Sequence, residues 1–186
     1  MIDRRIKHTE KLLTDALISL SLERGYDNLT IKDITDRADV AYSTFFRHYP
    51  DKPTLLIAMV SEAVDTLRNL ICRLPEDTPE DEGNILFQHI DQHEALYRVI
   101  LSSQIRKEVL RPVLDEIQQD VIRQYQSYGS TTIPLDVAAN HVISAILALA
   151  TWWLDHGKPY PIDQMGQIYS ELIIKATMRS AFGLDH

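Results

Sequence analysis

Apolar residues recur at intervals of three and four along most of this 186-residue chain, which is the spacing of amphipathic helices. The predicted long helices cover about residues 4–23, 52–71, 84–92, 94–103, 106–128, 142–154 and 162–180. Residues 75–83 are acidic, contain two prolines and are predicted to form a loop. No segment shows the alternation typical of a half-buried strand. We therefore expect an all-α protein of about nine helices.

Two shorter helices with a tight turn between them are predicted from Thr30 to Lys52. Thr30 can cap the first helix, and Asp33 three residues later completes a capping box. Asp39 tolerates the left-handed backbone of a sharp turn, and Pro50 closes the second helix. This layout is typical of a helix-turn-helix, whose second helix enters the major groove of DNA.

The outward face of the second short helix is rich in hydrogen-bond donors and aromatic rings. With Phe45 and Tyr49 on the inner side, the outward residues are Tyr42, Ser43, Thr44, Arg47 and His48. Such side chains suit phosphates and base edges, whereas an idle solvated face would carry mainly Glu and Lys. Thr30 and Lys52 stand at the starts of flanking helices, where backbone N–H groups favour a phosphate.

In this segment the chain resembles the TetR family of one-component transcriptional regulators. The residues that match the family's spacing without a gap are Gly25, Tyr26, Thr30, Ile31, Ile34, Ala38, Val40, Ala41, Thr44, Phe45, His48 and Lys52. Asp39 replaces the usual turn glycine, and Tyr49 replaces a phenylalanine. Phe46 stands where the family usually has a tyrosine that reaches a DNA phosphate, so it joins the predicted DNA-facing residues without that hydroxyl.

The resemblance implies a DNA-binding domain over residues 1–52 and a helical ligand-binding and dimerisation domain over residues 53–186. The net charge of −8 is unusual for a protein that must neutralise phosphates. However, residues 1–52 carry nine Lys or Arg and nine Asp or Glu, while the rest carry ten and eighteen. The acidity therefore belongs to the second domain, and the helix-turn-helix is neutral overall.

The segment 142–154 is apolar almost all round, so a helix there must be covered on every side. One side can face the chain's own core, and the other is expected to face a second subunit. Together with helix 162–180 it would form a four-helix dimer interface. The residues predicted for this interface are Ala145, Ala148, Leu149, Trp152, Ile168 and Leu172. The alternative is a monomer in which this helix is the centre of a single core.

Several side chains could line a ligand cavity, although plain core packing explains them as well. The predicted pocket residues are Ala63, Phe87, His93, Tyr97, Tyr125 and Trp152. His89 and His93 have the i, i+4 spacing of a metal pair, but no third ligand joins them and ordinary histidines are favoured. Cys72, the only cysteine, is expected to be a small core residue. We expect no metal, no cofactor and no enzyme, because no catalytic motif is present.

Two classes of function compete. The first is a regulator that binds a palindromic operator in double-stranded DNA as a homodimer and responds to a small-molecule effector of unknown identity, with repression expected from the family. The second is a helical adaptor or small-molecule carrier whose helix-turn-helix serves only packing. The first residues show no signal peptide, and no stretch is expected to reach the roughly 18–20 apolar residues of a membrane span. We therefore expect a cytoplasmic protein without membrane contact.

Overall fold

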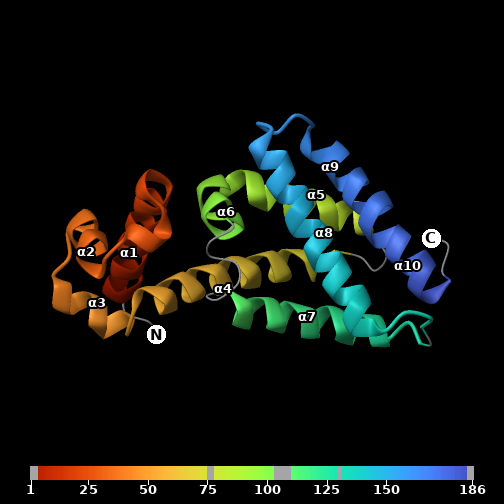
Figure 1. Cartoon of the computed structure of the whole chain (residues 1–186), viewed down its shortest axis with the longest axis horizontal. Helices are drawn as coiled ribbons and strands as arrows, with labels where there is room; N and C mark the ends of the chain where they lie inside the picture. Colours follow the sequence, from red (N-terminus) through yellow and green to blue (C-terminus); the bar gives the residue numbers. More distant parts are fainter. Residues whose placement is uncertain (1–3, 75–77, 103–109, 130, 184–186) are drawn as a thin grey trace. The chain divides into compact units, whose positions relative to one another are not determined.

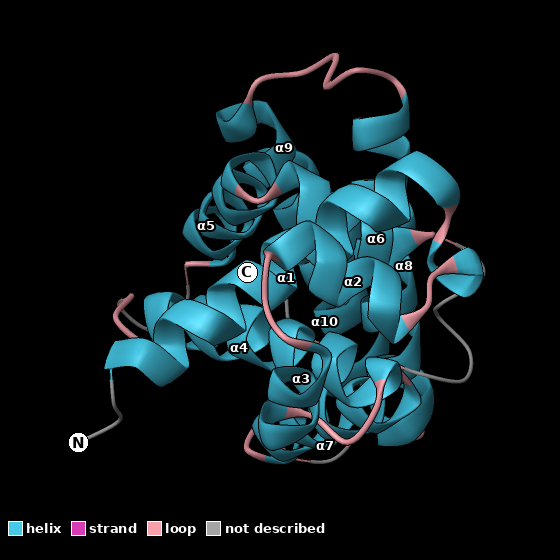
Figure 2. Ribbon diagram, turned by 90° about the vertical axis from the view of Figure 1, so that its left-hand side faces the viewer, coloured by secondary structure: helices cyan, strands magenta, loops and turns pink. Residues whose placement is uncertain are grey.

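The computed structural model describes residues 4–74, 78–102, 110–129 and 131–183, and helices account for nearly all of them (Figures 1 and 2). The helices are α1 (Arg4–Arg24), η1 (Tyr26–Asn28), α2 (Ile31–Ala38), α3 (Tyr42–His48), α4 (Lys52–Ile71), α5 (Pro79–Gln92), α6 (Glu94–Leu101), α7 (Arg111–Gln126), α8 (Leu135–Asp155), α9 (Ile162–Tyr169), the π-helical segment η2 (Ser170–Lys175) and α10 (Ala176–Phe182). Since α9, η2 and α10 follow one another without a break, the described residues form nine helices besides the short 3-10 turn η1. The predicted all-α fold is confirmed.

The chain forms two compact units. Unit 1 contains Met1–Val64 and Ala95–Arg111, and unit 2 contains Asp65–Glu94 and Pro112–His186. The helix-turn-helix lies wholly in unit 1. The boundary that we predicted at residue 52 concerns the division of function, and it stays a prediction.

Unit 1 is built around α1, whose buried residues repeat at three and four. Leu13, Leu17 and Leu20 are at most 2% exposed, and α1 packs against α2 and η1. Gly25 ends this helix with φ +79°, a backbone conformation that L side chains rarely adopt. The chain can therefore turn sharply after α1 and begin the helix-turn-helix.

Unit 2 is held together most extensively where α5 lies along α9. A Cβ atom on Gly83 would lie 2.8 Å from the Cα of Gly166, so the two backbones touch because neither residue has a side chain. Our prediction of a loop over residues 75–83 was wrong beyond residue 78, because Pro79 occupies the first turn of α5. Proline is tolerated there, where its missing N–H would have no helical partner.

Helix α8 is longer and more apolar than the sequence pattern suggested. It begins at Leu135, and its most apolar 18-residue window has a mean hydropathy of 1.5, enough to span a membrane by length and composition alone. The prediction that no stretch reaches this length was wrong, because the polar residues within this window, such as Asn140 and Ser144, are uncharged. A core helix passes the same test, and one such helix is weak support for a membrane span.

Candidate nucleic-acid interface and internal cavity

The capping and turn residues that the sequence predicted for the helix-turn-helix occupy those positions in the structure. The Thr30 hydroxyl accepts a hydrogen bond from the Asp33 N–H at 3.1 Å, and the Asp33 carboxylate accepts one from the Thr30 N–H at 2.8 Å. The Thr30 hydroxyl also donates to the Asp33 carboxylate, and this bond, together with the one from the Thr30 N–H, lowers the pKa of Asp33. Asp39 ends α2 with φ 53° and ψ 45°, the left-handed conformation expected of it. The capping box and the turn are therefore local features that fix the entry to α3.

Helix α3 presents an aromatic and hydroxyl-bearing face. Phe45 is fully buried, whereas Tyr42 and Phe46 are 54% and 47% exposed. The two exposed rings meet edge to face with centroids 5.2 Å apart. Ser43 and Arg47 are exposed as well, and Thr44 is half-buried. The structure thus brings most of the predicted DNA-facing residues onto one surface of unit 1.

His48 does not belong to this outward face. Its side chain is only 10% exposed, and its Nδ1 lies 3.5 Å from the Glu10 carboxylate of α1. The expectation that His48 looks outward was wrong, because α3 is short and its last turn rests against α1. His48 is therefore placed to position α3 through Glu10.

Lys52 has partners within unit 1. Its Nζ donates hydrogen bonds of 2.8 Å to the carbonyl oxygens of Tyr26 and Leu29 and lies 4.2 Å from the centroid of the Tyr26 ring. Burial lowers the pKa of Lys52 and raises that of Tyr26 to about 12. The ammonium thus joins the start of α4 to the chain segment that precedes α2. An ammonium has three N–H donors, so these two bonds leave one for a phosphate.

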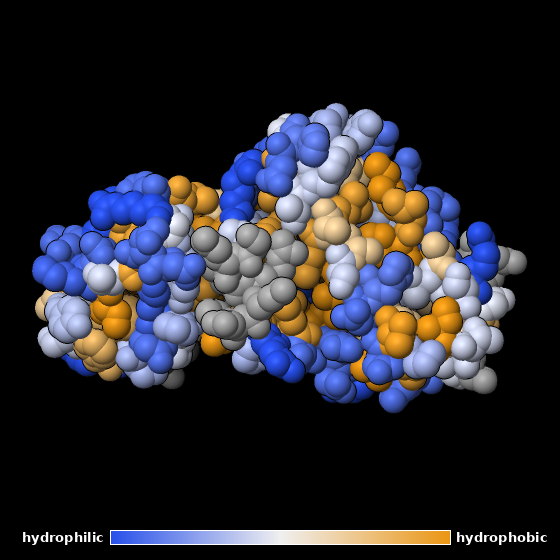
Figure 3. Space-filling model, viewed as in Figure 1, coloured by the Kyte–Doolittle hydropathy of each residue, from blue (hydrophilic) through white to orange (hydrophobic). Residues whose placement is uncertain are grey.

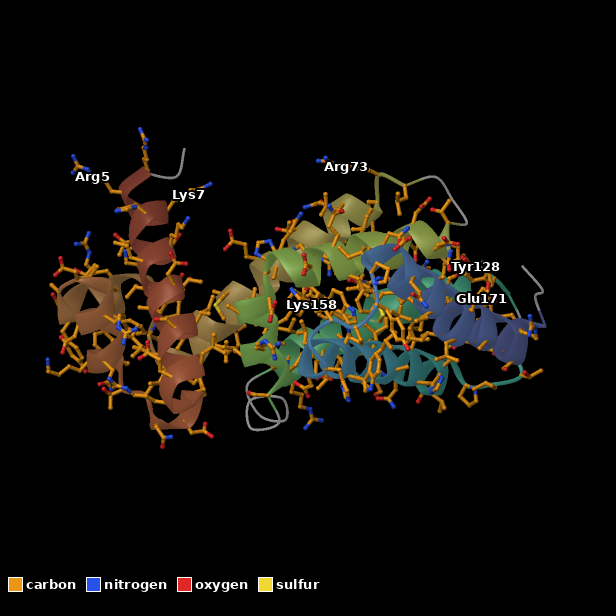
Figure 4. All side chains as sticks on the ribbon, turned by 90° about the horizontal axis from the view of Figure 1, so that it is seen from above. Arg5, Lys7, Arg73, Tyr128, Lys158 and Glu171 are labelled. Atoms are coloured by element: carbon orange, nitrogen blue, oxygen red, sulfur yellow. The ribbon has the colours of Figure 1, made fainter. Side chains whose placement is uncertain are left out.

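Basic side chains also gather at the start of α1. Arg4, Arg5, Lys7 and Lys11 are all exposed. Arg5 and Lys7 extend outward from the first turns of the helix (Figure 4). Near the other end of α1, Arg37 of α2 makes two 2.7 Å hydrogen bonds to Glu23. Unit 1 therefore combines a rigidly joined helix-turn-helix with a cationic helix end, which suits a phosphate backbone.

Unit 2 contains a cavity of about 490 Å³. It is bounded by the last turn of α4, the start of α5, the end of α7, the middle of α8 and the α9–η2–α10 helix. Its lining comprises Ile71, Leu74, Thr78, Pro79, Glu82, Val121, Gln124, Tyr125, Ser127, Tyr128, Val142, Ile146, Tyr169, Ile174 and Met178. This volume is typical of sites for small organic ligands.

Among the residues predicted to line a pocket, Tyr125 lines this cavity. Phe87 instead packs edge to face against Trp153 in the core, with ring centroids 5.3 Å apart. His93 is exposed with its ring 4.6 Å from that of His89, and Trp152 is 39% exposed. The remaining two predicted residues, Ala63 and Tyr97, belong to unit 1.

Six polar lining residues were missed by the sequence reasoning, namely Thr78, Glu82, Gln124, Ser127, Tyr128 and Tyr169. Glu82 lies within the predicted loop of residues 75–83. The i, i+3 spacing of Tyr125 and Tyr128 was the one available signal, because it places both rings on the same side of α7 and the turn after it.

The described residues contain no group of three or more His, Cys, Asp or Glu side chains that could hold a metal ion. Cys72, which we expected in the core, is exposed. It lies one residue beyond the end of α4, where the helix no longer holds it against a neighbour.

Two family profiles match the chain. That of bacterial regulatory proteins of the tetR family matches residues 13–59, and that of a transcriptional regulator C-terminal region matches residues 77–175, more than half of the 186 residues. The chain belongs to the TetR family of bacterial regulatory proteins. It is a TetR-family transcriptional regulator, and the resemblance seen in the sequence is confirmed.

Relatives of this TetR-family chain include transcriptional regulators from several bacteria. The HTH-type regulator YxbF of Bacillus subtilis is 24% identical over 179 residues, covering 92% of this chain and 46% of YxbF. An HTH-type regulator of Haemophilus influenzae is 28% identical over 158 residues, covering 71% of this chain and 77% of the relative. The chain spans less than half the length of YxbF and of YuxN, another B. subtilis regulator, of which it covers 40%.

Solved structures of TetR-family regulators share the fold. A regulator from Syntrophomonas wolfei aligns with a TM-score of 0.77 at 17% identity, covering 92% of this chain and 96% of that one. FadR from Bacillus subtilis, solved with stearoyl-CoA, aligns with a TM-score of 0.65 at 17% identity, covering 88% and 97%. At this identity the likeness concerns the fold.

The TetR-family chain leaves apolar side chains exposed on α8 and on the helix after it. Leu172 is 68% exposed and Trp152 39% exposed. Ala148 is exposed, while the other predicted interface residues, Ala145, Leu149 and Ile168, are half-buried. Figure 3 shows hydrophobic residues gathered at the surface over α8 and α9. A face of this kind is typical of a protein–protein contact surface.

Proposed function

We propose that this TetR-family regulator binds a palindromic operator as a homodimer and releases it when a small organic effector binds the C-terminal domain. The observation that carries the DNA-binding part is the outward face of α3, with Tyr42, Ser43, Phe46 and Arg47 exposed above a buried Phe45. The capping box and the Lys52 contacts hold that face rigidly, which suits a helix that must fit a groove.

Homodimer formation is supported by the apolar residues exposed on α8 and η2. An isologous interface uses the same patch on both subunits. It would place two copies of α3 on one face of the duplex, roughly 34–36 Å or one helical turn apart, and this spacing requires a palindromic site. Charging the patch by Ala148→Glu should give monomers that lose specific DNA binding. A stable wild-type monomer at micromolar concentration in sedimentation would contradict this part.

Effector binding is supported by the cavity in unit 2 and by the ligands in solved structures of similar fold. FadR was solved with stearoyl-CoA, the multidrug binding protein EbrR with imidazole, and RolR with resorcinol. Helix α4 begins at Lys52 in unit 1 and ends at Ile71, which lines the cavity. A ligand that binds one arrangement of this helix more tightly than another can change operator affinity by no more than that difference in binding free energy. For typical couplings the change in operator affinity is about 5–150-fold.

Repression is favoured over activation because KstR of Rhodococcus jostii, a transcriptional repressor, is 25% identical over 84 residues, 45% of this chain. A regulator of this kind acts on the chromosome, so we place the protein in the cytoplasm. The proposal treats the chain as a DNA-binding protein without catalytic activity.

The test is selection of binding sites from random DNA duplexes, followed by affinity measurements at two salt concentrations. We expect a palindromic site, and an affinity that falls as salt rises. Arg47→Ala or Tyr42→Ala should change which sequences bind. Lys32→Ala is the matched control, because Lys32 is exposed on α2 and pairs with Asp36. Failure to select any site, with unit 1 folded, would instead favour an adaptor or small-molecule carrier.

A further inference from the structure

The exposed face of α3 divides into two strips of different chemistry. Residues four apart on an α-helix lie only about 40° apart around its axis. Tyr42 and Phe46 therefore form one strip, which we call the aromatic strip. Ser43 and Arg47 form a second, the polar strip, about 100° further round the helix. All four side chains are exposed, so α3 presents ring carbon beside hydrogen-bonding groups along the same turns.

The aromatic strip is held in place by contacts between rings. The Tyr42 and Phe46 centroids are 5.2 Å apart with an interplanar angle of 68°. The Phe46 ring also meets the ring of the fully buried Phe45 edge to face, with centroids 5.5 Å apart. Edge-to-face pairs favour one relative orientation of their rings. The outer surface of Phe46 is therefore fixed against the core of unit 1.

Packing among the described residues leaves large parts of both rings in water, with Tyr42 54% and Phe46 47% exposed. Single exposed apolar side chains are common, as Ile6 and Leu22 are near opposite ends of α1. The two rings on α3 differ because they touch each other and form a joint apolar surface. The Phe46 side chain has no polar atom, so it cannot hydrogen bond to a phosphate or a base edge.

The major groove of B-DNA offers one apolar group to such a surface. Hydrogen-bond donors and acceptors line the edges of all four base pairs, whereas the C5-methyl group is carried by thymine alone. Apolar side chains distinguish thymine by contact with this methyl. The aromatic strip therefore matches the methyl in its chemistry, and the polar strip matches the donors and acceptors beside it.

We propose that the aromatic strip recognises the C5-methyl group of thymine, and that each operator half-site carries a thymine facing Tyr42 and Phe46. The polar strip contacts the hydrogen-bonding edges of neighbouring bases. This inference rests on the proposed function, because it names the chemical group by which the same helix selects its operator.

The test starts from the DNA duplex that the full chain selects and replaces each thymine in turn by deoxyuridine, which lacks only the methyl group. Burial of one methyl corresponds to about fourfold in affinity, so one position in each half-site should show a loss of that size. Replacing both symmetry-related thymines should lower the affinity about fifteenfold, close to the product of the two effects. The proposal is overturned if no replacement weakens binding by more than about 1.5-fold.

A second set of duplexes separates the methyl group from the hydrogen-bonding groups of thymine. The sensitive T·A pair is replaced by a C·G pair whose cytosine is either unmodified or 5-methylated. The methylated duplex should bind about fourfold more tightly than the unmethylated one. Equal affinities would mean that the protein senses the thymine O4 or the shape of the duplex at this position, and would overturn the proposal.

Variants of the protein locate the recognition on α3. Phe46→Ala should weaken binding of the thymine duplex and bring the thymine and uracil duplexes to within about 1.5-fold of each other. Leu22→Ala is the matched control, because Leu22 is apolar and 50% exposed on α1. It should leave the difference between the two duplexes at about fourfold. If Phe46→Ala does not fold, Tyr42→Ala provides the same comparison and keeps the contact between Phe45 and Phe46.

Two further outcomes would overturn the proposal. One is a difference between thymine and uracil duplexes that persists in both Phe46→Ala and Tyr42→Ala, because other residues would then contact the methyl group. The other is a change of oligomeric state in Phe46→Ala with that difference intact, because the rings would then contact protein. Failure of the full chain to select any duplex rejects the proposed function, whereas a selected duplex without methyl dependence rejects this inference alone.

Discussion

The contact between Lys52 and the segment before α2 gives a quantitative prediction for unit 1. Lys52→Met keeps most of the apolar stem and removes the ammonium, which donates 2.8 Å hydrogen bonds to the carbonyl oxygens of Tyr26 and Leu29. A hydrogen bond to a charged group contributes about 1.5–3 kcal/mol. Burial lowers the pKa of Lys52, which indicates a desolvation cost that offsets part of the gain. We expect a net destabilisation of about 2–3 kcal/mol.

The assay has to follow unit 1 separately, because both tryptophans of the chain lie in α8 and tryptophan fluorescence therefore reports on unit 2. Amide hydrogen exchange of Ile31–Ala38, measured by mass spectrometry, reports opening of α2 directly. A loss of about 2–3 kcal/mol should accelerate this exchange about 30–150-fold, since each 1.4 kcal/mol is a factor of ten.

Lys32→Met is the matched control. Lys32 pairs with Asp36 on the surface of α2, with side chains 74% and 63% exposed. Exposed i, i+4 pairs contribute about 0.3–0.5 kcal/mol, so exchange should change by roughly a factor of two. If Lys52→Met changes the exchange of α2 no more than Lys32→Met does, the stabilising role of the two Lys52 hydrogen bonds is refuted.

Three further predictions concern local features. Thr30→Ala removes the N-cap of α2 and should destabilise unit 1 by about 1 kcal/mol in the same exchange experiment. An unchanged exchange rate of α2 would show that the cap does not stabilise the helix. Gly166→Ala should destabilise unit 2 by about 1–3 kcal/mol in urea unfolding, because its Cβ would lie 2.0 Å from Asn84 Oδ1 and 2.8 Å from a backbone oxygen. Burial, and to a lesser degree His93, lowers the pKa of His89 below 6.5. Because the unfolded state then binds the proton more readily than the folded state, the stability of the protein should fall as the pH drops below about 6.5. His89→Gln should flatten that fall, whereas His141→Gln at an exposed position should not.

The helix-turn-helix could be predicted because its signals act over a few residues. Thr30 and Asp33 form the capping box through atoms three residues apart, and Asp39 takes the left-handed conformation by itself. The burial of Phe45 follows from helical spacing. The orientation of His48 could not be predicted in this way, because it depends on Glu10, which lies 38 residues earlier in the chain.

The cavity depends on contacts between residues far apart in sequence. Helix α5 lies along α9 because Gly83 and Gly166 allow their backbones to touch. Nothing near either glycine in sequence indicates that the other is its partner. Once α5 is fixed against α9, Glu82 comes to the same cavity as Tyr169. A sequence pattern that treats each helix alone therefore finds Tyr125 and misses the carboxylate.

The π-helical segment explains how the last helix serves two surfaces of unit 2. At 3.6 residues per turn, Ile174 would lie about 140° around the helix from Tyr169. The wider turn of Ser170–Lys175 brings positions five residues apart onto one side, and both residues line the cavity. Leu172, between them, is 68% exposed. A ligand that favours this wider turn over a regular α-helix would change the exposed face through the same backbone, so effector binding and subunit contact can share one structural element.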